Sequence, residues 1–170
     1  MDLRTFIRDI PDFPEPGVLF RDITPLLGHP QALAEALDWF TSAIHASDAD
    51  AIVAIESRGF IFGAPVAARL QLPFVPVRKP GKLPAARMSV EYSLEYGSSQ
   101  LDIHQDALSD GARVAIVDDL LATGGTAAAA AKLVELAGGR VVLFTFLVEL
   151  SELNGRSRLQ GYRTESLIPY

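Results

Sequence analysis

The chain has 170 residues, of which 15 are Lys or Arg and 21 are Asp or Glu, and its formal net charge is −6 at pH 7. This acidic balance argues against broad nucleic-acid binding, which depends on an excess of cations that neutralise phosphates. Because the sequence contains no cysteine, a disulfide framework, a thiolate metal site and a cysteine nucleophile are all excluded.

The length predicts one domain, residues 1–170, and a hydrophobic content of 49% is enough for a core with helices on both sides of a sheet. The first residues, MDLRTFIRDIPDF, contain no apolar core of signal-peptide length, and no apolar run approaches membrane-spanning length. We therefore expect a cytoplasmic protein.

The first half of the chain predicts an alternation of helices and strands. A short amphipathic segment at Leu3–Ile10 leads into the proline-rich turn PDFPEPG. A longer helix is predicted from about Pro30, a residue suited to a first helical turn, to Ile44. The apolar run Asp50–Glu56 predicts a strand, which leads through the string SRGF into an alanine-rich helix over Gly63–Leu70.

The second half contains one irregular insertion. Pro73–Val77 is short and extended, and residues 79–100 then break the periodicity with prolines, glycines and charges. Such a stretch predicts a long loop or a β-excursion, which in compact domains is usually a lid or a binding loop. Gly138 and Gly139 end a later alanine-rich helix, and Arg140–Leu150 is predicted to be the final strand, because the tail has little pattern.

The segment RVAIVDDLLATGGT carries the clearest chemical signal. Val114–Val117 is a β-branched run typical of a parallel strand covered on both faces, and we expect Asp118 and Asp119 to end it. Adjacent acids are costly inside a buried sheet, so they are predicted at its carboxyl edge, where open α/β sheets bind ligands. Thr123–Thr126, Thr-Gly-Gly-Thr, can converge backbone N–H groups on one anion at the start of the following helix.

This combination predicts a site for a single phosphate and a diol. The loop contains no lysine, so it is not a Walker loop, and it lacks the GxGxxG spacing of a dinucleotide fold. The structural alternative is a strand, a polar turn and a capped helix. The paired acids count against that alternative, because two carboxylates have no structural task at such a turn.

A basic cluster follows another predicted strand. Arg78, Lys79 and Lys82 lie within RKPGKLP, and Arg58 opens the segment after the strand AIVAIES. Both groups are predicted at the same sheet edge as the acid pair, where cations could hold pyrophosphate. The structural alternatives are a solvated charged face for the cluster and a salt bridge at a helix start for Arg58.

Two weaker strings remain. YSLEYG at Tyr92–Gly97 places an acid between two tyrosines, a pattern that also occurs on many exposed hairpins. In VLFRD, Phe20 is either a core residue or an aromatic platform on which a base stacks.

Taken in order, FPEPGVLFRDITPLL, ESRGFIFGAPVA, VPVRKPGKLP, YSLEYG, VDDLLATGGT and LVEL resemble the type I phosphoribosyltransferases, and among them the members that use adenine. The resemblance covers nearly the whole chain. It implies an α/β fold, with a parallel sheet, flanking helices, a small N-terminal hood at about residues 1–30 and a mobile lid loop at about 79–100. It also implies an unusual peptide conformation between Glu56 and Ser57.

The resemblance assigns residues around the base. Phe20 would stack on adenine with Leu120 on its other face, and the backbone of Leu19 and Arg21 would read the edge of the base. Glu95 would be the general base or proton-positioning group on the loop that closes over the reactants. A role for Arg87, in the poorly aligned segment that leads into this loop, is left open.

The resemblance also divides the substrate among three groups of residues. Asp118 and Asp119 would bind the ribose hydroxyls. The 5′-phosphate would be bound by the loop residues Ala122, Thr123, Gly124, Gly125 and Thr126. The pyrophosphate would be bound by the cations Arg58, Arg78, Lys79 and Lys82.

The implied reaction is the formation of AMP and pyrophosphate from adenine and 5-phosphoribosyl 1-pyrophosphate, by inverting displacement through an oxocarbenium-like transition state. Mg²⁺ would be held mainly by the pyrophosphate, the ribose hydroxyls and water, without a dedicated protein cluster. A homodimer is implied as well. Two alternatives stay open: a transferase for another purine, and a regulator that binds the phosphoribosyl compound without turnover.

Overall fold

The structure is a computed structural model that describes residues 1–93 and 97–170. The chain forms two compact units, Met1–Trp39 and Phe40–Tyr170. Helix α2, Pro30–His45, begins in the first unit and ends in the second. It confirms the helix predicted from about Pro30 to Ile44. Glu95 is in the short stretch outside the described residues.

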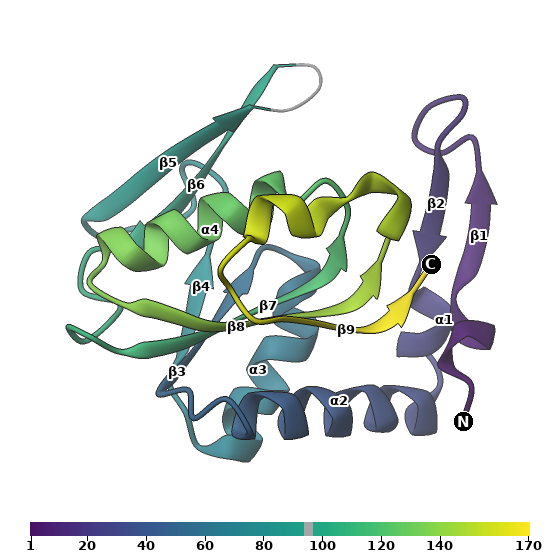
Figure 1. Cartoon of the computed structure of the whole chain (residues 1–170), viewed down its shortest axis with the longest axis horizontal. Helices are drawn as coiled ribbons and strands as arrows, with labels where there is room; N and C mark the ends of the chain where they lie inside the picture. The colour runs from purple at the N-terminus through teal and green to yellow at the C-terminus, as the bar shows by residue number, and fades with distance from the viewer. Residues whose placement is uncertain (94–96) are drawn as a thin grey trace. The chain divides into compact units, whose positions relative to one another are not determined.

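The first unit is built around a β-hairpin (Figure 1). A 3-10 helix at Leu3–Phe6 precedes strands β1, Arg8–Pro11, and β2, Leu19–Asp22, which pair antiparallel, and helix α1, Thr24–Leu27, follows. The proline-rich turn PDFPEPG lies between the two strands. The predicted turn is therefore confirmed, and it joins the strands of a hairpin.

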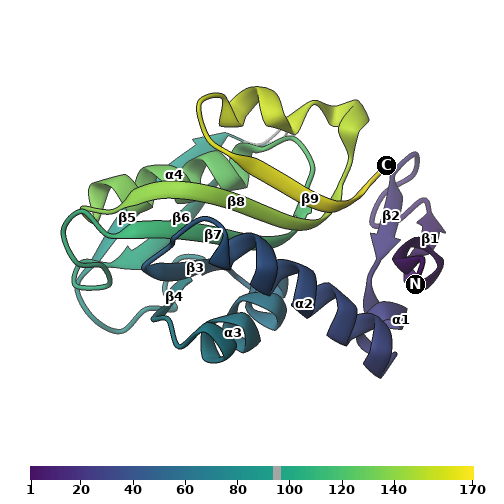
Figure 2. The same cartoon turned by 60° about the horizontal axis from the view of Figure 1, so that its bottom comes forward.

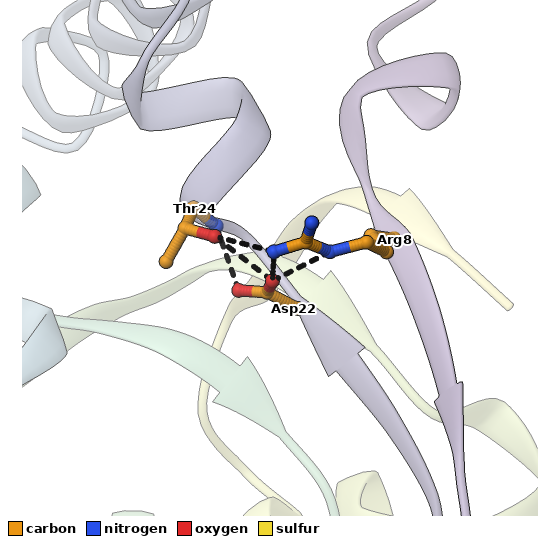
Figure 3. A network of polar contacts seen from close by, with 3 residues as sticks. All are labelled: Arg8, Asp22 and Thr24. Carbon is orange, nitrogen blue, oxygen red and sulfur yellow. Dashed lines mark hydrogen bonds and ion pairs between the residues drawn. The ribbon is translucent and has the colours of Figure 1, made fainter.

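A polar network at the end of this hairpin fixes its connection to α1 (Figure 3). Asp22 lies opposite Arg8 in the strand register and accepts hydrogen bonds from Arg8 Nε at 3.0 Å and Nη2 at 2.6 Å. The amide of Thr24 donates to the other carboxylate oxygen at 2.9 Å. These bonds, with the Thr24 amide first and Arg8 next, outweigh the burial of Asp22 and lower its pKa. This network therefore fixes the C-terminal end of the string VLFRD at Asp22.

The second unit contains a five-stranded sheet in which every neighbouring pair is parallel. Its order is β4-β3-β7-β8-β9. The strands span Ala51–Ile55 (β3), Phe74–Val77 (β4), Arg113–Leu121 (β7), Arg140–Glu149 (β8) and Thr164–Pro169 (β9). From β3 the chain adds β4 on one side and later β7 on the other, so the strand order reverses between β3 and β7. That is where open parallel sheets bind ligands.

Helices cover both faces of this sheet, as Figures 1 and 2 show. Helix α3, Arg58–Leu70, packs on the face where a Cβ at Gly63 would lie 2.7 Å from Ala54 Cβ. Helix α4, Gly125–Leu136, packs on the opposite face, where Val53 and Ile55 join its alanines in one hydrophobic core. The two faces follow from the alternation of side chains along β3.

Residues 87–93 and 98–104 form two antiparallel strands beside α4, so the β-excursion predicted as one alternative for residues 79–100 is confirmed. Strand β5 spans Arg87–Ser93 and β6 spans Ser98–His104. Leu101 and Ile103 of β6 are fully buried in the core shared with α4. This pair of strands is thereby anchored on the second unit by β6.

Three boundaries differ from the predictions. Helix α3 begins at Arg58, five residues before the predicted Gly63, and Gly59 and Gly63 allow it to pack closely on the sheet. A Cβ at Gly59 would lie only 2.7 Å from Val117 O. Strand β7 continues through both acids to Leu121, since β8 still pairs with it there.

The third difference is strand β9, which the sequence analysis missed when it ended the sheet at Leu150. Two short 3-10 helices, Ser151–Leu153 and Gly155–Leu159, connect β8 to β9.

The Glu56–Ser57 peptide bond is cis, which is the kind of unusual peptide conformation that the resemblance implies. Among the helices of the described residues, none is long and apolar enough to span a membrane.

Candidate functional site

A cavity of about 450 Å³ opens at the carboxyl ends of β3 and β7. Its wall is formed by the residues after β3, the end of β7, the start of α4 and parts of β5 and β6. It brings together most residues that the sequence predicts for the substrate: Arg58, Lys79, Lys82, Asp118, Asp119, Leu120, Ala122, Thr123, Gly124, Gly125 and Thr126. The strand reversal thus predicts the position of the cavity correctly.

The acid pair lies on β7 with one carboxylate already paired. Arg58 Nε donates to Asp119 Oδ2 at 2.5 Å, and the Asp119 side chain is only 7% exposed. This ion pair joins the first residue of α3 to β7. Burial alone would lower the pKa of Arg58, but the carboxylate of Asp119 outweighs it and raises the pKa. The salt bridge predicted as the structural alternative for Arg58 is therefore present, inside the cavity.

Asp118 has a different environment from Asp119. Its carboxylate accepts the amide of Asp119 at 2.9 Å and borders the cavity. Loss of hydration, followed by the negative charge of Asp119, raises the pKa of Asp118 well above its usual value. A carboxyl group in this state binds a proton, a cation or a hydroxyl donor readily, since each relieves the cost of an isolated negative charge.

The loop between β7 and α4 has the backbone geometry that the Thr-Gly-Gly-Thr motif predicts. Gly124 has φ +82°, and a Cβ there would lie 2.4 Å from Gly155 O. Helix α4 starts at Gly125, and the backbone N–H groups of its first turn have no partner within the helix. Gly125 and Thr126 of this turn line the cavity. The hydroxyl of Thr126 donates to that of Tyr92 at 3.3 Å, which connects the loop to β5. Backbone donors at a helix start are suited to a phosphate.

The basic cluster is organised by Glu56. This carboxylate, 7% exposed, accepts Arg78 Nε at 3.2 Å and the amide of Lys79 at 2.9 Å, and it forms an ion pair with Lys82. Burial raises the pKa of Glu56, but the bonds from Lys82 and Lys79 and the nearby positive charges outweigh it and lower the pKa. Three of the predicted pyrophosphate residues therefore meet at one anion. Arg78 takes part without lining the cavity.

Comparison with known proteins places this site in a family. The phosphoribosyl transferase domain model matches residues 24–165. The adenine phosphoribosyltransferases of Gloeobacter violaceus and Thermotoga neapolitana are 58% and 56% identical, each over the full length of both chains. The chain belongs to the adenine phosphoribosyltransferase family. Its α/β fold with a parallel sheet and flanking helices is the fold of that family.

Solved structures of the family agree with this assignment. The crystal structure of adenine phosphoribosyltransferase from Thermoanaerobacter pseudethanolicus has a TM-score of 0.96 at 53% identity, and covers 99% of this chain and 98% of its own. The enzyme from Saccharomyces cerevisiae, crystallised with an imino-altritol bisphosphate and adenine, has a TM-score of 0.93 at 38% identity over 98% and 97% of the two chains.

The residues that the family resemblance assigns to adenine are distributed over the two units. Leu19, Phe20 and Arg21 lie on β2 in the first unit, whereas Leu120 lines the cavity of the second. Phe20 is half-buried and meets the ring of Phe13 edge to face at 5.1 Å. Phe20 therefore packs on Phe13 within its own unit while part of its surface stays exposed.

Four features of the site were missed from the sequence. Glu56, Tyr92 and Gly155 were not predicted as neighbours of the substrate groups, and Arg87, whose role was left open, pairs with the buried Asp102 at 3.4 Å. A single acid after a strand, such as Glu56, does not indicate that three cations of a later loop will contact it. Gly155 lies in the segment that showed little pattern.

Proposed function

We propose that the chain transfers the 5-phosphoribosyl group of 5-phosphoribosyl 1-pyrophosphate to N9 of adenine, giving AMP and pyrophosphate in purine salvage. The observation that supports this most is that an acid pair, a phosphate loop and a cation cluster border one cavity. The family to which the chain belongs carries the same activity in its name. The displacement inverts the anomeric carbon through an oxocarbenium-like transition state.

The acid pair is proposed to hold the ribose. Asp118 and Asp119 accept hydrogen bonds from the 2′ and 3′ hydroxyls, which offer the donors that the crowded Asp118 carboxylate lacks. Arg58 orients the carboxylate of Asp119 through its hydrogen bond. The loop Ala122–Thr126 takes the 5′-phosphate through its N–H groups and Thr hydroxyls. With both ends of the ribose phosphate fixed, the anomeric carbon is positioned for in-line displacement.

The cations at Glu56 are proposed to receive the leaving group. Arg78 and Lys82 pair with this carboxylate, and the backbone amide of Lys79 donates to it. Pyrophosphate carries more negative charge than one carboxylate, so it competes for the same donors when it enters the cavity. Arg58, also at the cavity wall, completes the group of pyrophosphate residues.

Adenine recognition is proposed to follow the family pattern. Phe20 and Leu120 stack on the base, the backbone of Leu19 and Arg21 reads its edge, and Glu95 positions the proton at the purine. A base stacked on an aromatic gains roughly 1–3 kcal/mol. Support comes from relatives: the yeast structure contains adenine, and that of the Giardia lamblia enzyme, 35% identical, contains 9-deazaadenine.

Magnesium fits the donors of this cavity. Within residues 1–93 and 97–170 no three His, Cys, Asp or Glu residues are grouped to hold a metal, while Asp118 and Asp119 supply hard oxygen donors at the cavity wall. These two residues would help to hold Mg²⁺ through the ribose hydroxyls, with the pyrophosphate and water providing the other oxygens. When bound, the ion neutralises charge that develops on the leaving group. We also propose a homodimer and a cytoplasmic location, as the resemblance implies.

One assay tests the proposal: purified protein with adenine, 5-phosphoribosyl 1-pyrophosphate and Mg²⁺, with AMP as the product measured. The matched control is the variant Asp118→Asn with Asp119→Asn, which should fold but lose turnover. Faster product formation from hypoxanthine or guanine would indicate a transferase for another purine. Binding of the phosphoribosyl compound without any product would indicate a regulator.

The role of Glu95 requires a separate variant. Glu95→Gln should lower the turnover number by about 10²–10⁴, the usual contribution of a positioned acid or base. Its affinity for adenine should change much less. A variant that turns over adenine at the wild-type rate would show that this carboxylate does not handle the proton.

A further inference from the structure

The phosphate loop has no cation of its own. Residues 122–126 are Ala, Thr, Gly, Gly and Thr, so a phosphate dianion bound there would be neutralised only by backbone N–H dipoles and hydroxyls. Phosphate sites built on a helix start commonly add a lysine or arginine, because a charged donor forms stronger bonds to phosphate oxygens than a neutral one does. The sequence around the loop offers no such residue.

The fold brings an arginine to this loop from the segment between β8 and β9. A Cβ at Gly124 would lie 3.3 Å from Arg158 Cβ, and one at Gly125 would lie 3.6 Å from Arg158 Nη1. The side chain therefore runs along the loop from Gly124 to Gly125, with its guanidinium beside the first residue of α4. Gly125 also borders the cavity.

This position is held by contacts that do not involve the guanidinium of Arg158. Gly155 packs so closely on the loop that a Cβ there would lie 2.3 Å from Ala122 O. Arg156 binds both oxygens of Glu149, at 2.7 and 2.8 Å, and donates to Thr164 O at 2.7 Å. The 3-10 helix Gly155–Leu159 is thus fixed to both β8 and β9. Arg158 is carried on a rigid turn.

The guanidinium itself has no partner among the residues that the structure describes. Arg156 and Arg163 pair with Glu149 and Glu165 in the same region, whereas Arg158 is exposed and forms neither an ion pair nor a hydrogen bond with any described residue. In a chain with a net charge of −6, an arginine held rigidly at a phosphate loop without a carboxylate partner is free to bind an anion.

We infer that Arg158 is a 5′-phosphate-binding residue, which supplies from the C-terminal segment the positive charge that the loop lacks. The inference rests on the proposed function for the identity of the ligand, a ribose 5-phosphate ester. Its guanidinium neutralises one phosphate oxygen while the N–H groups of the loop hold the others. Arg158 therefore discriminates the phosphorylated sugar from adenine and from pyrophosphate, which bind elsewhere in the cavity.

The experiment measures dissociation constants by titration calorimetry for ribose 5-phosphate, AMP, adenine and pyrophosphate. Arg158→Gln should weaken ribose 5-phosphate and AMP about tenfold, the lower end of the range for a hydrogen bond to a charged group. Adenine and pyrophosphate affinities should stay within about twofold, as expected when one charged contact is removed from a single subsite. Arg158→Lys should recover part of the loss, because it restores the charge without the planar fork.

The matched control is Arg140→Gln. Arg140 is an exposed arginine at the first residue of β8, the end of the sheet opposite to the cavity, so this variant makes the same change in net charge. It should bind all four ligands like the wild type. Melting temperatures of the three variants check that each is folded.

Three results would overturn the inference: wild-type affinity of Arg158→Gln for ribose 5-phosphate, an equal loss in Arg140→Gln, or an equal loss for adenine and pyrophosphate. Steady-state kinetics add a second readout, since Arg158→Gln should raise the KM for the phosphoribosyl substrate about tenfold with kcat nearly unchanged. If the wild type forms no AMP, the proposed function fails, and the ribose 5-phosphate titrations still decide the role of Arg158.

Discussion

The two glycines of the phosphate loop should respond to alanine in opposite ways, although they are neighbours in the sequence. Gly124 has φ +82°, and an added Cβ would lie 2.4 Å from Gly155 O, a backbone atom that cannot rotate away. Gly125 has no positive φ, and its nearest neighbours would be side-chain atoms of Arg158 at 3.6 Å and Tyr92 at 3.7 Å. Only the first position therefore requires glycine.

The structure sets the size of the difference. A left-handed backbone costs a residue with a Cβ about 1–2 kcal/mol, and a methyl group forced into a packed site costs about 1–3 kcal/mol more. Gly124→Ala should therefore lower the free energy of unfolding by about 2–5 kcal/mol, which for a chain of this length lowers the melting temperature by about 4–20 °C. Gly125→Ala should be neutral or stabilise the protein by up to about 1 kcal/mol, because alanine restricts the unfolded chain.

Differential scanning calorimetry of the two variants measures this contrast, and titration with ribose 5-phosphate measures its consequence for binding. Gly124→Ala should lose at least tenfold in affinity, because the loop must move its N–H groups to admit the methyl group. The reasoning would be refuted if Gly125→Ala proved as destabilised as Gly124→Ala. It would also be refuted if Gly124→Ala melted at the wild-type temperature.

Three further predictions concern the carboxylates and the metal. The lowered pKa of Glu149, caused first by its hydrogen bonds from Arg156, means that its carboxylate stabilises the fold above the unfolded pKa near 4.3 and that this contribution is lost as pH falls through the folded pKa. Glu149→Gln should cost about 1–2 kcal/mol at pH 7, and its difference in melting temperature from the wild type should shrink as pH falls below the unfolded pKa. The pKa of Asp118 is raised, so its ionised carboxyl group destabilises the fold at pH 7. Asp118→Asn should therefore melt above the wild type at pH 7 and yet bind ribose 5-phosphate about tenfold more weakly, and a lower melting temperature would contradict this. Chelation with EDTA should lower AMP formation by at least about a hundredfold, with full recovery on adding excess Mg²⁺, and activity that survives chelation would exclude the proposed metal.

The sequence predicted the elements whose apolar residues are continuous or regularly spaced. Strand β3, buried at all five residues, and helix α2, with its regular apolar spacing, were placed within one or two residues. Strand β9 was missed because it lies at the edge of the sheet, and most of its residues are only half-buried. An edge strand needs no continuous apolar run, so its composition resembles that of a loop.

The candidate site was predictable where chemistry is local in the sequence. Asp118, Asp119 and the loop that follows them lie together because they are consecutive, and the parallel sheet places them at the same edge as Arg58. Glu56 and Arg158 could not be predicted in this way. The residues that they contact lie more than 20 positions away in the chain, and only the packed fold brings Glu56 to Lys79 and Arg158 to Gly124.

The close packing of Gly155 on Ala122 has a consequence for the order in which the protein matures. On the ribosome, the acid pair and the phosphate loop are synthesised well before the turn that supports the loop. An unfinished chain can thus display the complete VDDLLATGGT motif while the loop still lacks the backbone that constrains Gly124. We therefore expect the loop to bind a phosphate fully only after Gly155 has been synthesised and has packed on it, so that affinity for ribose 5-phosphate reports whether the turn at Gly155 has folded.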